Sequence, residues 1–329
     1  MWIILAIPIV ILLATVIYLA TLDGTFKVSR SLKIEAPNDA VFAAIVDLKS
    51  WPSWSPWLMH EPDARLDYSE DYQLEGGSYR WDGKRVGAGK LSHVSIKPHS
   101  RIEQQIEFTR PFKSVNQVCW KFEDRGNCTL VTWEMSGRMP FLFRFMTRRM
   151  EPMIGRDYDL GLALLNGYLN SDASHPAISF DGPRELEDFT YWAIPRNGNL
   201  RQLEAARQPD IETLKAAARG KTGLALTLYH QFDPLASNYR AEVAIPVTDS
   251  TPLSNYTRRP FNGGRYFCMT LGGDHKFLPL AWYALSCHCR MHRFKQDISR
   301  PALEIYHDNP AETSNSNQVT TALYLPIKL

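Results

Sequence analysis

The 329-residue sequence lacks the features that mark several large functional classes. It has 37 Lys and Arg against 35 Asp and Glu, so a net charge of +2 gives no basic excess for a nucleic acid backbone. Five cysteines, an odd number without regular spacing, do not suggest a disulfide framework. No helix-turn-helix pattern, dinucleotide fingerprint or ordered Ser-His-Asp set is recognisable. We therefore expect no nucleic acid partner and no cofactor.

Charge is also missing from the first 22 residues. As a helix they would extend about 33 Å, at about 1.5 Å per residue, which is enough to cross a hydrocarbon core of about 30 Å. No basic residue precedes this run, whereas Lys27, Arg30 and Lys33 follow it, unlike the basic start of a cleaved signal peptide. We therefore expect a single-pass transmembrane helix at 1–22 that contacts membrane lipid, with the remaining chain in the cytoplasm.

Residues 24–169 have the pattern of an α+β domain. Strand-like alternation over 26–36 is followed by a short helical pattern, by strand-like segments separated by turn residues over 65–138, and by a helical pattern over 154–169. Trp51, Trp54 and Trp57 lie among prolines and carry too much apolar area to leave in water. They form either a packed corner of the core or the lip of a lipophilic pocket.

Four motifs, in this order, carry a family resemblance: Ile34-Glu35-Ala36-Pro37, the tryptophan segment 51–57, Tyr79-Arg80-Trp81 and Gly161-Leu162. Together they resemble the START-like (SRPBCC) polyketide cyclase/dehydrase family. The resemblance implies a helix-grip fold that encloses a hydrophobic ligand between its sheet and its last helix. Trp54 and Trp57 are then candidate ligand contacts, and no catalytic residue is implied.

Residues 170–183 have the composition of a linker, and an internal repeat follows in residues 184–329. Ala225–His230 matches Ala302–His307 at an offset of 77 positions, from Ala225 to Ala302. Each half reads as strand, helix, strand, strand. We expect the halves to pair around a pseudo-twofold axis and to leave a cleft at their seam.

One carboxylate, Glu304, interrupts the apolar pattern of the predicted strand 302–306, and the matching position in the first half is Thr227. Strand alternation places Glu304 and Tyr306 on one face, and Leu303 and Ile305 on the other. If the first face lines a cavity, Glu304 binds a cation or acts as a general base. The alternative is a solvated sheet face.

The segments Pro301–Tyr306 and Leu323–Lys328 resemble the GyrI-like effector-binding domains, which also terminate many bacterial transcription activators. The resemblance implies a central pocket for small, often cationic or aromatic ligands, in which Glu304 is the pocket carboxylate. The expected aromatic walls, able to contact a cation, are Tyr306, Tyr229, Trp192, Tyr266 and Trp282.

Three functional hypotheses follow. The first is a sensing protein at the bacterial cell membrane that binds hydrophobic or cationic small molecules. The second is a hydrolase or cyclase-type enzyme with Glu304 as general base, and the third is a scaffold for protein partners. The lack of an identifiable second acid or base favours binding. We expect no metal site, because Cys287 and Cys289 would point away from each other on a helix.

Overall fold

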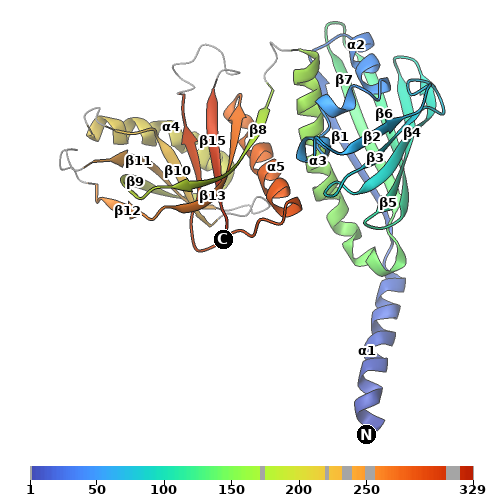
Figure 1. The fold of residues 1–329 in the computed structure, drawn as a ribbon, viewed down its shortest axis with the longest axis horizontal. Coiled ribbons are helices and arrows are strands. Elements are labelled where there is room, and N and C mark those ends of the chain that lie inside the picture. The colour runs from blue at the N-terminus through green and yellow to red at the C-terminus, as the bar shows by residue number, and fades with distance from the viewer. Residues whose placement is uncertain are drawn as a thin grey trace. The chain divides into compact units, whose positions relative to one another are not determined.

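The computed structural model describes residues 2–170, 175–218, 222–231, 239–248, 256–308 and 319–328. The chain divides into two compact units, Met1–Ala173 and Ser174–Leu329. Each unit contains one antiparallel sheet and the helices that pack on it (Figure 1).

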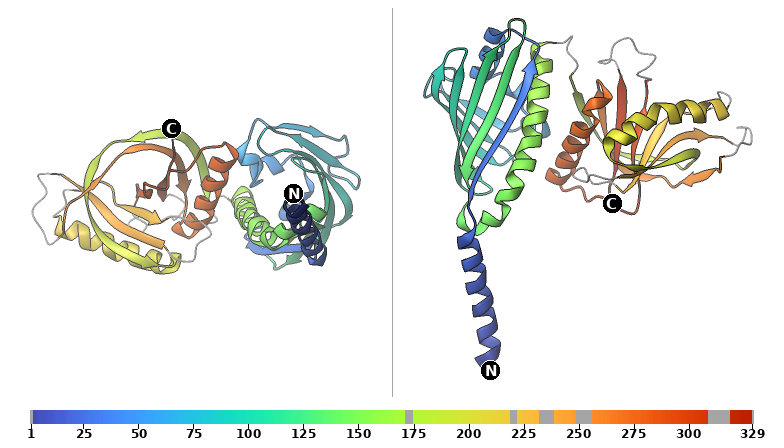
Figure 2. Two further views of the ribbon diagram at one scale, coloured as in Figure 1. Left: turned by 90° about the horizontal axis from the view of Figure 1, so that it is seen from below. Right: turned by 180° about the vertical axis from the view of Figure 1, so that it is seen from behind.

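The first unit has seven strands and three α-helices in its described residues. Its sheet order, β1-β7-β6-β5-β4-β3-β2, is a meander closed at one edge by β1. The sheet curves around the long helix α3 (Figure 2). The elements are α1 (Trp2–Thr21), β1 (Thr25–Ile34), α2 (Asn38–Val46), β2 (Arg65–Tyr68), β3 (Ser78–Asp82), β4 (Ala88–Lys97), β5 (Arg101–Arg110), β6 (Ser114–Asp124), β7 (Thr129–Arg138) and α3 (Thr147–Leu169).

The prediction of a transmembrane helix over residues 1–22 is wrong. Crossing a bilayer requires a helix of about 20 predominantly apolar residues. Within the part of the chain that the structure describes, no helix combines the length and the apolar character that such a span needs. The predicted location at a bacterial cell membrane stays a prediction.

The second unit is built from two similar halves. Its sheet order, β12-β9-β11-β10-β14-β15-β13-β8, places equivalent strands at equal distances from the centre. The elements are β8 (Ala177–Leu186), β9 (Phe189–Gly198), α4 (Leu200–Ala217), β10 (Leu226–Gln231), β11 (Tyr239–Val247), β12 (Arg259–Phe261), β13 (Gly264–Gly272), α5 (Leu278–Met291), β14 (Ala302–Tyr306) and β15 (Thr320–Pro326). The halves are therefore β9-α4-β10-β11 and β13-α5-β14-β15.

The pseudo-twofold axis passes beside Glu304. In the antiparallel pairing of the two central strands, β10 and β14, Thr227 lies opposite Glu304. The sequence repeat maps Thr227 onto Glu304, so these two equivalent residues face each other across the axis. The carboxylate thus lies at the centre of the eight-stranded sheet.

Both helices of the second unit cover the same face of its sheet. Trp282 of α5 packs in one core cluster with Tyr229, and Ile211 of α4 packs in another with Tyr306. The opposite face has a separate cluster that includes Leu303. Since residues on a strand alternate between faces, Glu304 points toward the helices.

Candidate ligand-binding site

The carboxylate of Glu304 is enclosed by three aromatic hydrogen-bond donors. Its Oε1 accepts from the Tyr229 hydroxyl at 3.0 Å and from Trp282 Nε1 at 2.6 Å. Its Oε2 accepts from the Tyr306 hydroxyl at 2.6 Å. Glu304 is 1% exposed. The interpretation of this face as a solvated one is therefore wrong, and three of the five predicted aromatic residues contact the carboxylate directly.

Burial keeps these tyrosines protonated. Desolvation raises the pKa of Tyr229 and of Tyr306 well above the usual value, and the charge of Glu304 adds to the effect in both. Because Tyr306 donates its single proton to Glu304, the contact of 2.7 Å between its oxygen and Thr227 Oγ1 must be donated by Thr227. The threonine that replaces the carboxylate in the first half thus supports the carboxylate in the second.

The counter-charge comes from Arg207, a residue that was not predicted from the sequence. Its Nη2 lies 3.7 Å from Glu304 Oε2, and its Cζ lies 5.2 Å from the centre of the Tyr306 ring. Burial disfavours the charged guanidinium, but the interactions with Tyr306 and Glu304 outweigh burial and raise the pKa of Arg207. A signal was present in the sequence: Arg207 is four residues from Leu203 and from Ile211, so it lies on the buried stripe of α4.

His275 completes the arrangement from the segment that precedes α5. Its Nδ1 accepts a hydrogen bond of 3.0 Å from Arg207 Nη1, because a guanidinium can only donate. Its Nε2 then carries the proton and donates to Thr321 Oγ1 at 3.0 Å. Burial, with a further contribution from the charge of Arg207, lowers the pKa of His275 to about 4. The imidazole is therefore neutral at physiological pH.

A cavity of about 480 Å³ borders this cluster. Arg207, His275 and Tyr306 form part of its wall, so the cavity reaches the cation of the buried pair. Glu304 itself is not a wall residue. The remaining wall comes from α4, from the segment before β10 and from the end of β14: Gln208, Ile211, Lys215, Thr222, Gly223, Leu224, Ala225, His307 and Asp308.

Two predicted wall residues lie elsewhere in the second unit. Trp192 is on the helix-covered face, in the cluster that includes Tyr306, but it is not among the residues that line the cavity. Tyr266 is on the opposite face. Both are buried, and neither the Trp192 Nε1 nor the Tyr266 hydroxyl has a hydrogen-bond partner among the described residues. Their predicted role in ligand binding stays a prediction.

The predicted contacts of the first unit lie in and beside a tryptophan core. Trp54 is 1% exposed and packs against Trp51 and Trp133. Trp57 is half-buried, and its Nε1 donates to Asp157 Oδ2 at 3.0 Å. The placement of Trp54 is that of a packed corner of the core. A role for either residue at the lip of a ligand pocket stays a prediction.

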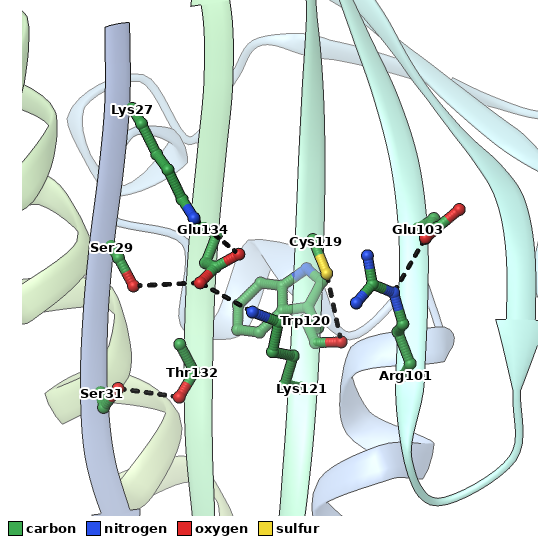
Figure 3. A network of polar contacts seen from close by, with 10 residues as sticks. All are labelled: Lys27, Ser29, Ser31, Arg101, Glu103, Cys119, Trp120, Lys121, Thr132 and Glu134. Atoms are coloured by element: carbon green, nitrogen blue, oxygen red, sulfur yellow. Dashed lines mark hydrogen bonds and ion pairs between the residues drawn. The ribbon is translucent and has the colours of Figure 1, made fainter.

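The outer face of the same sheet carries a different carboxylate cluster (Figure 3). Glu134 of β7 accepts from Lys121 Nζ at 2.9 Å and from Ser29 Oγ at 3.5 Å, and Lys27 Nζ lies 3.8 Å from its second oxygen. The hydrogen bond from Lys121 lowers the pKa of Glu134. Lys27 and Lys121 are 66% and 42% exposed, so this cluster is in contact with solvent.

The described residues contain no group of three His, Cys, Asp or Glu side chains that is placed to hold a metal ion. The His288 ring stacks on Phe180 and on His292, with ring centres 3.9 and 4.1 Å apart. These contacts are packing contacts.

Family models match both units. The model described as "Polyketide cyclase / dehydrase and lipid transport" matches residues 25–169, and the model described as "GyrI-like small molecule binding domain" matches residues 184–328. Both family resemblances predicted from the sequence are therefore confirmed. No curated protein matches the chain.

Solved structures show similarity at low identity. CalU16 from Micromonospora echinospora is 16% identical with a TM-score of 0.32, over 44% of this chain and 76% of that one. The C-terminal domain of EcmrR is 15% identical with a TM-score of 0.38, over 47% and 98%. SAV2435, solved bound to tetraphenylphosphonium, is 17% identical with a TM-score of 0.36, over 46% and 94%. Scores this low carry no argument, so the assignment depends on the family models. Residues 25–169 of the chain are therefore similar to the polyketide cyclase/dehydrase and lipid transport family, and residues 184–328 to the GyrI-like small molecule binding domains.

Proposed function

We propose that residues 184–328 bind a small organic molecule in the cavity of about 480 Å³. The observation that carries the proposal is that this cavity opens onto a buried charge pair, through Arg207, His275 and Tyr306. Its volume lies in the range of about 300–1,000 Å³ that is usual for ligand pockets, and a mixed wall with a few polar groups is typical of them. The match to a small-molecule binding family supports the same function.

The cationic ligand that the sequence predicts would need Glu304 as its counter-charge. Arg207 already lies beside that carboxylate and over the Tyr306 ring. A cationic ligand would have to displace the guanidinium of Arg207, a residue that is 8% exposed and is hydrogen-bonded to His275. For this reason we place the ligand in the cavity and not in direct contact with the Glu304 carboxylate.

An enzymatic role for Glu304 finds less support. A general base must come within about 2.6–3.2 Å of the proton that it removes, directly or through one water. Glu304 does not line the cavity, and both of its oxygens already accept hydrogen bonds. Binding is therefore preferred to turnover.

Filling the cavity tests the proposal. Leu224 lines the cavity and is 46% exposed, so Leu224→Trp adds an indole there without removing a buried side chain. Ile298 is 83% exposed and lies outside the cavity wall, and Ile298→Trp is the matched control. Native mass spectrometry of the 329-residue chain, with a panel of small aromatic acids, alcohols and amines, should show binding that is at least about tenfold weaker in Leu224→Trp only. Equal binding in both variants and in the parent protein would overturn the proposal.

A further inference from the structure

We infer that the cavity selects an organic acid, whose carboxylate binds the guanidinium of Arg207. This inference rests on the proposed function, because it assigns a ligand class to the same cavity. It makes Arg207 the residue that contacts the ligand and makes Glu304 a positioning residue behind it.

The guanidinium is held in one orientation but retains free donors. A guanidinium has five N–H groups in a rigid fork. Among the residues that the structure describes, it makes one hydrogen bond, to His275, in addition to its ion pair with Glu304. The Tyr306 ring fixes the plane on a third side. Arg207 is one of the residues that line the cavity, so a ligand there can approach the guanidinium and accept from its remaining N–H groups.

The charges on the cavity wall favour an anion. Two basic side chains line it, Arg207 and Lys215, against one carboxylate, Asp308, and Glu304 balances Arg207 from behind the wall. Oδ2 of Asp308 already accepts from the backbone N–H of Thr320 at 3.0 Å. A carboxylate placed against Arg207 contacts the guanidinium directly, whereas Glu304 lies behind it and is not a wall residue, so an acid is favoured at this end of the cavity.

The wall also has a place for the apolar part of such an acid. Arg207, Ile211 and Lys215 follow each other at intervals of four residues, so they share one face of α4 over about 12 Å. Leu224 and Ala225 supply apolar atoms from the segment before β10. An acid with a short apolar or aromatic tail can therefore place its carboxylate at Arg207 and its tail along Ile211.

Three probes with one skeleton test the inference: 4-phenylbutyrate, 4-phenylbutanol and 4-phenylbutylamine. In isothermal titration calorimetry with the 329-residue chain, we expect the acid to bind at least about tenfold more tightly than the amine. In the double variant Arg207→Gln with Glu304→Gln, which removes both charges together, this preference should disappear. In Arg207→Gln alone, the carboxylate of Glu304 is unpaired, so the amine should bind more tightly than the acid. Arg201→Gln, on an exposed position of α4, is the control and should leave the preference for the acid unchanged.

The outcomes separate this inference from the proposed function. If the amine binds most tightly to the parent protein, the inference is overturned, and the comparison of Leu224→Trp with Ile298→Trp shows whether the amine occupies the cavity. If the acid keeps its preference in the double variant, Arg207 is not its partner. If the variants at Arg207 do not fold, Lys215→Gln at the exposed rim decides the question, since it should weaken the acid several-fold and not the alcohol. If no probe binds the parent protein, the anion inference fails, and the comparison of Leu224→Trp with Ile298→Trp decides separately whether the cavity binds anything.

Discussion

Glu134 and Glu304 have similar sets of partners in different surroundings. Each carboxylate accepts hydrogen bonds and lies beside a basic side chain. The lysines at Glu134 reach solvent, whereas Arg207 and Glu304 have side chains that are 10% and 1% exposed. At about 4 Å, two unit charges interact by about 1 kcal/mol in water and by about 4 kcal/mol at an effective dielectric constant of about 20. Burial therefore determines how strongly the charges of each cluster interact.

The comparison extends to the interior of each unit. The interior of the first unit contains neutral polar groups beside its sheet, such as Trp120, which donates to Gln104 Oε1 at 3.0 Å. Gln104 in turn lies 3.3 Å from His93 Nδ1, and burial lowers the pKa of His93. The second unit instead places an ion pair beside a cavity. A buried charge beside a cavity is a candidate for ligand recognition, whereas a charge on a solvated sheet face contributes mainly to solubility.

Removing the basic partner should give the largest difference between the two clusters. Arg207→Met leaves Glu304 buried without its counter-charge and should lower the free energy of unfolding by about 3–5 kcal/mol. Lys121→Met leaves Glu134 beside Lys27 and water and should lower it by less than about 1 kcal/mol. Urea unfolding, with hydrogen exchange followed in β14 and in β7, measures the two effects. Equal losses would mean that burial does not separate the clusters.

The second largest effect should be a pH dependence that comes from His275. Its pKa is about 4 in the folded protein and about 6.5 when unfolded, so the unfolded state takes up the proton first as the pH falls. The stability that neutral His275 provides is complete above about pH 6.5 and is lost between that pH and about 4, by up to roughly 3 kcal/mol. The groups whose charges act on it are Arg207, Glu304 and Asp274.

His275→Asn isolates this contribution, because an amide oxygen can accept from Arg207 and does not titrate. Urea unfolding of both proteins at pH 7 and pH 4.5 gives the comparison. His288, whose pKa is also lowered to about 4 by burial, is present in both and cancels. If both proteins lose stability equally between pH 7 and pH 4.5, the surroundings of His275 do not lower its pKa as described.

Local sequence patterns predicted the centre of the site around Glu304, but they did not predict its contacts with residues that are distant in the sequence. Strand alternation placed Glu304 beside Tyr306, and the repeat identified Thr227 as the equivalent position. A further signal was available, because Tyr191-Trp192 recurs as Tyr266-Phe267 at an offset of 75 positions, from Tyr191 to Tyr266. Tyr266 is thus equivalent to Tyr191, and strand alternation places Tyr191 on the face opposite Trp192. Selecting Trp192 and Tyr266 for one pocket wall therefore mixed two faces.

The basic residues of the site were harder to find. Arg207 reaches Glu304 from a helix nearly a hundred positions earlier, and their contact depends on how α4 is rotated against the sheet. His275 lies in the short connection before α5, where no periodicity marks a buried side chain. A charged residue within an apolar helical stripe was the available signal for Arg207, and His275 had none.

A smaller effect should follow from the hydroxyl that faces Glu304 across the pseudo-twofold axis. Thr227→Val removes the hydrogen bond to the Tyr306 oxygen, while Tyr306 still donates to Glu304. The expected loss is about 1 kcal/mol in the free energy of unfolding. Ser31→Ala removes a hydrogen bond of similar length, 2.8 Å to Thr132 on the outer face of the first unit, and should change stability by less. A larger effect for Ser31→Ala would contradict the role given to burial.

The smallest effect is expected for Glu134→Gln. The hydrogen bonds from Lys121 and Ser29 can be kept by the amide oxygen, so only screened charge interactions with Lys121 and Lys27 are lost, at about 0.5 kcal/mol or less. Because the Debye length falls from about 10 Å at 0.1 M salt to about 3 Å at 1 M, unfolding midpoints of the variant and the parent protein should converge with added salt. The effect of Arg207→Met should persist at 1 M salt, since ions do not reach a carboxylate that is 1% exposed. The comparison would be reversed if the stability loss of Arg207→Met fell with added salt while that of Glu134→Gln did not. Such a result would indicate that solvent ions reach Glu304. Glu304 would then again be a candidate direct partner for a cationic ligand.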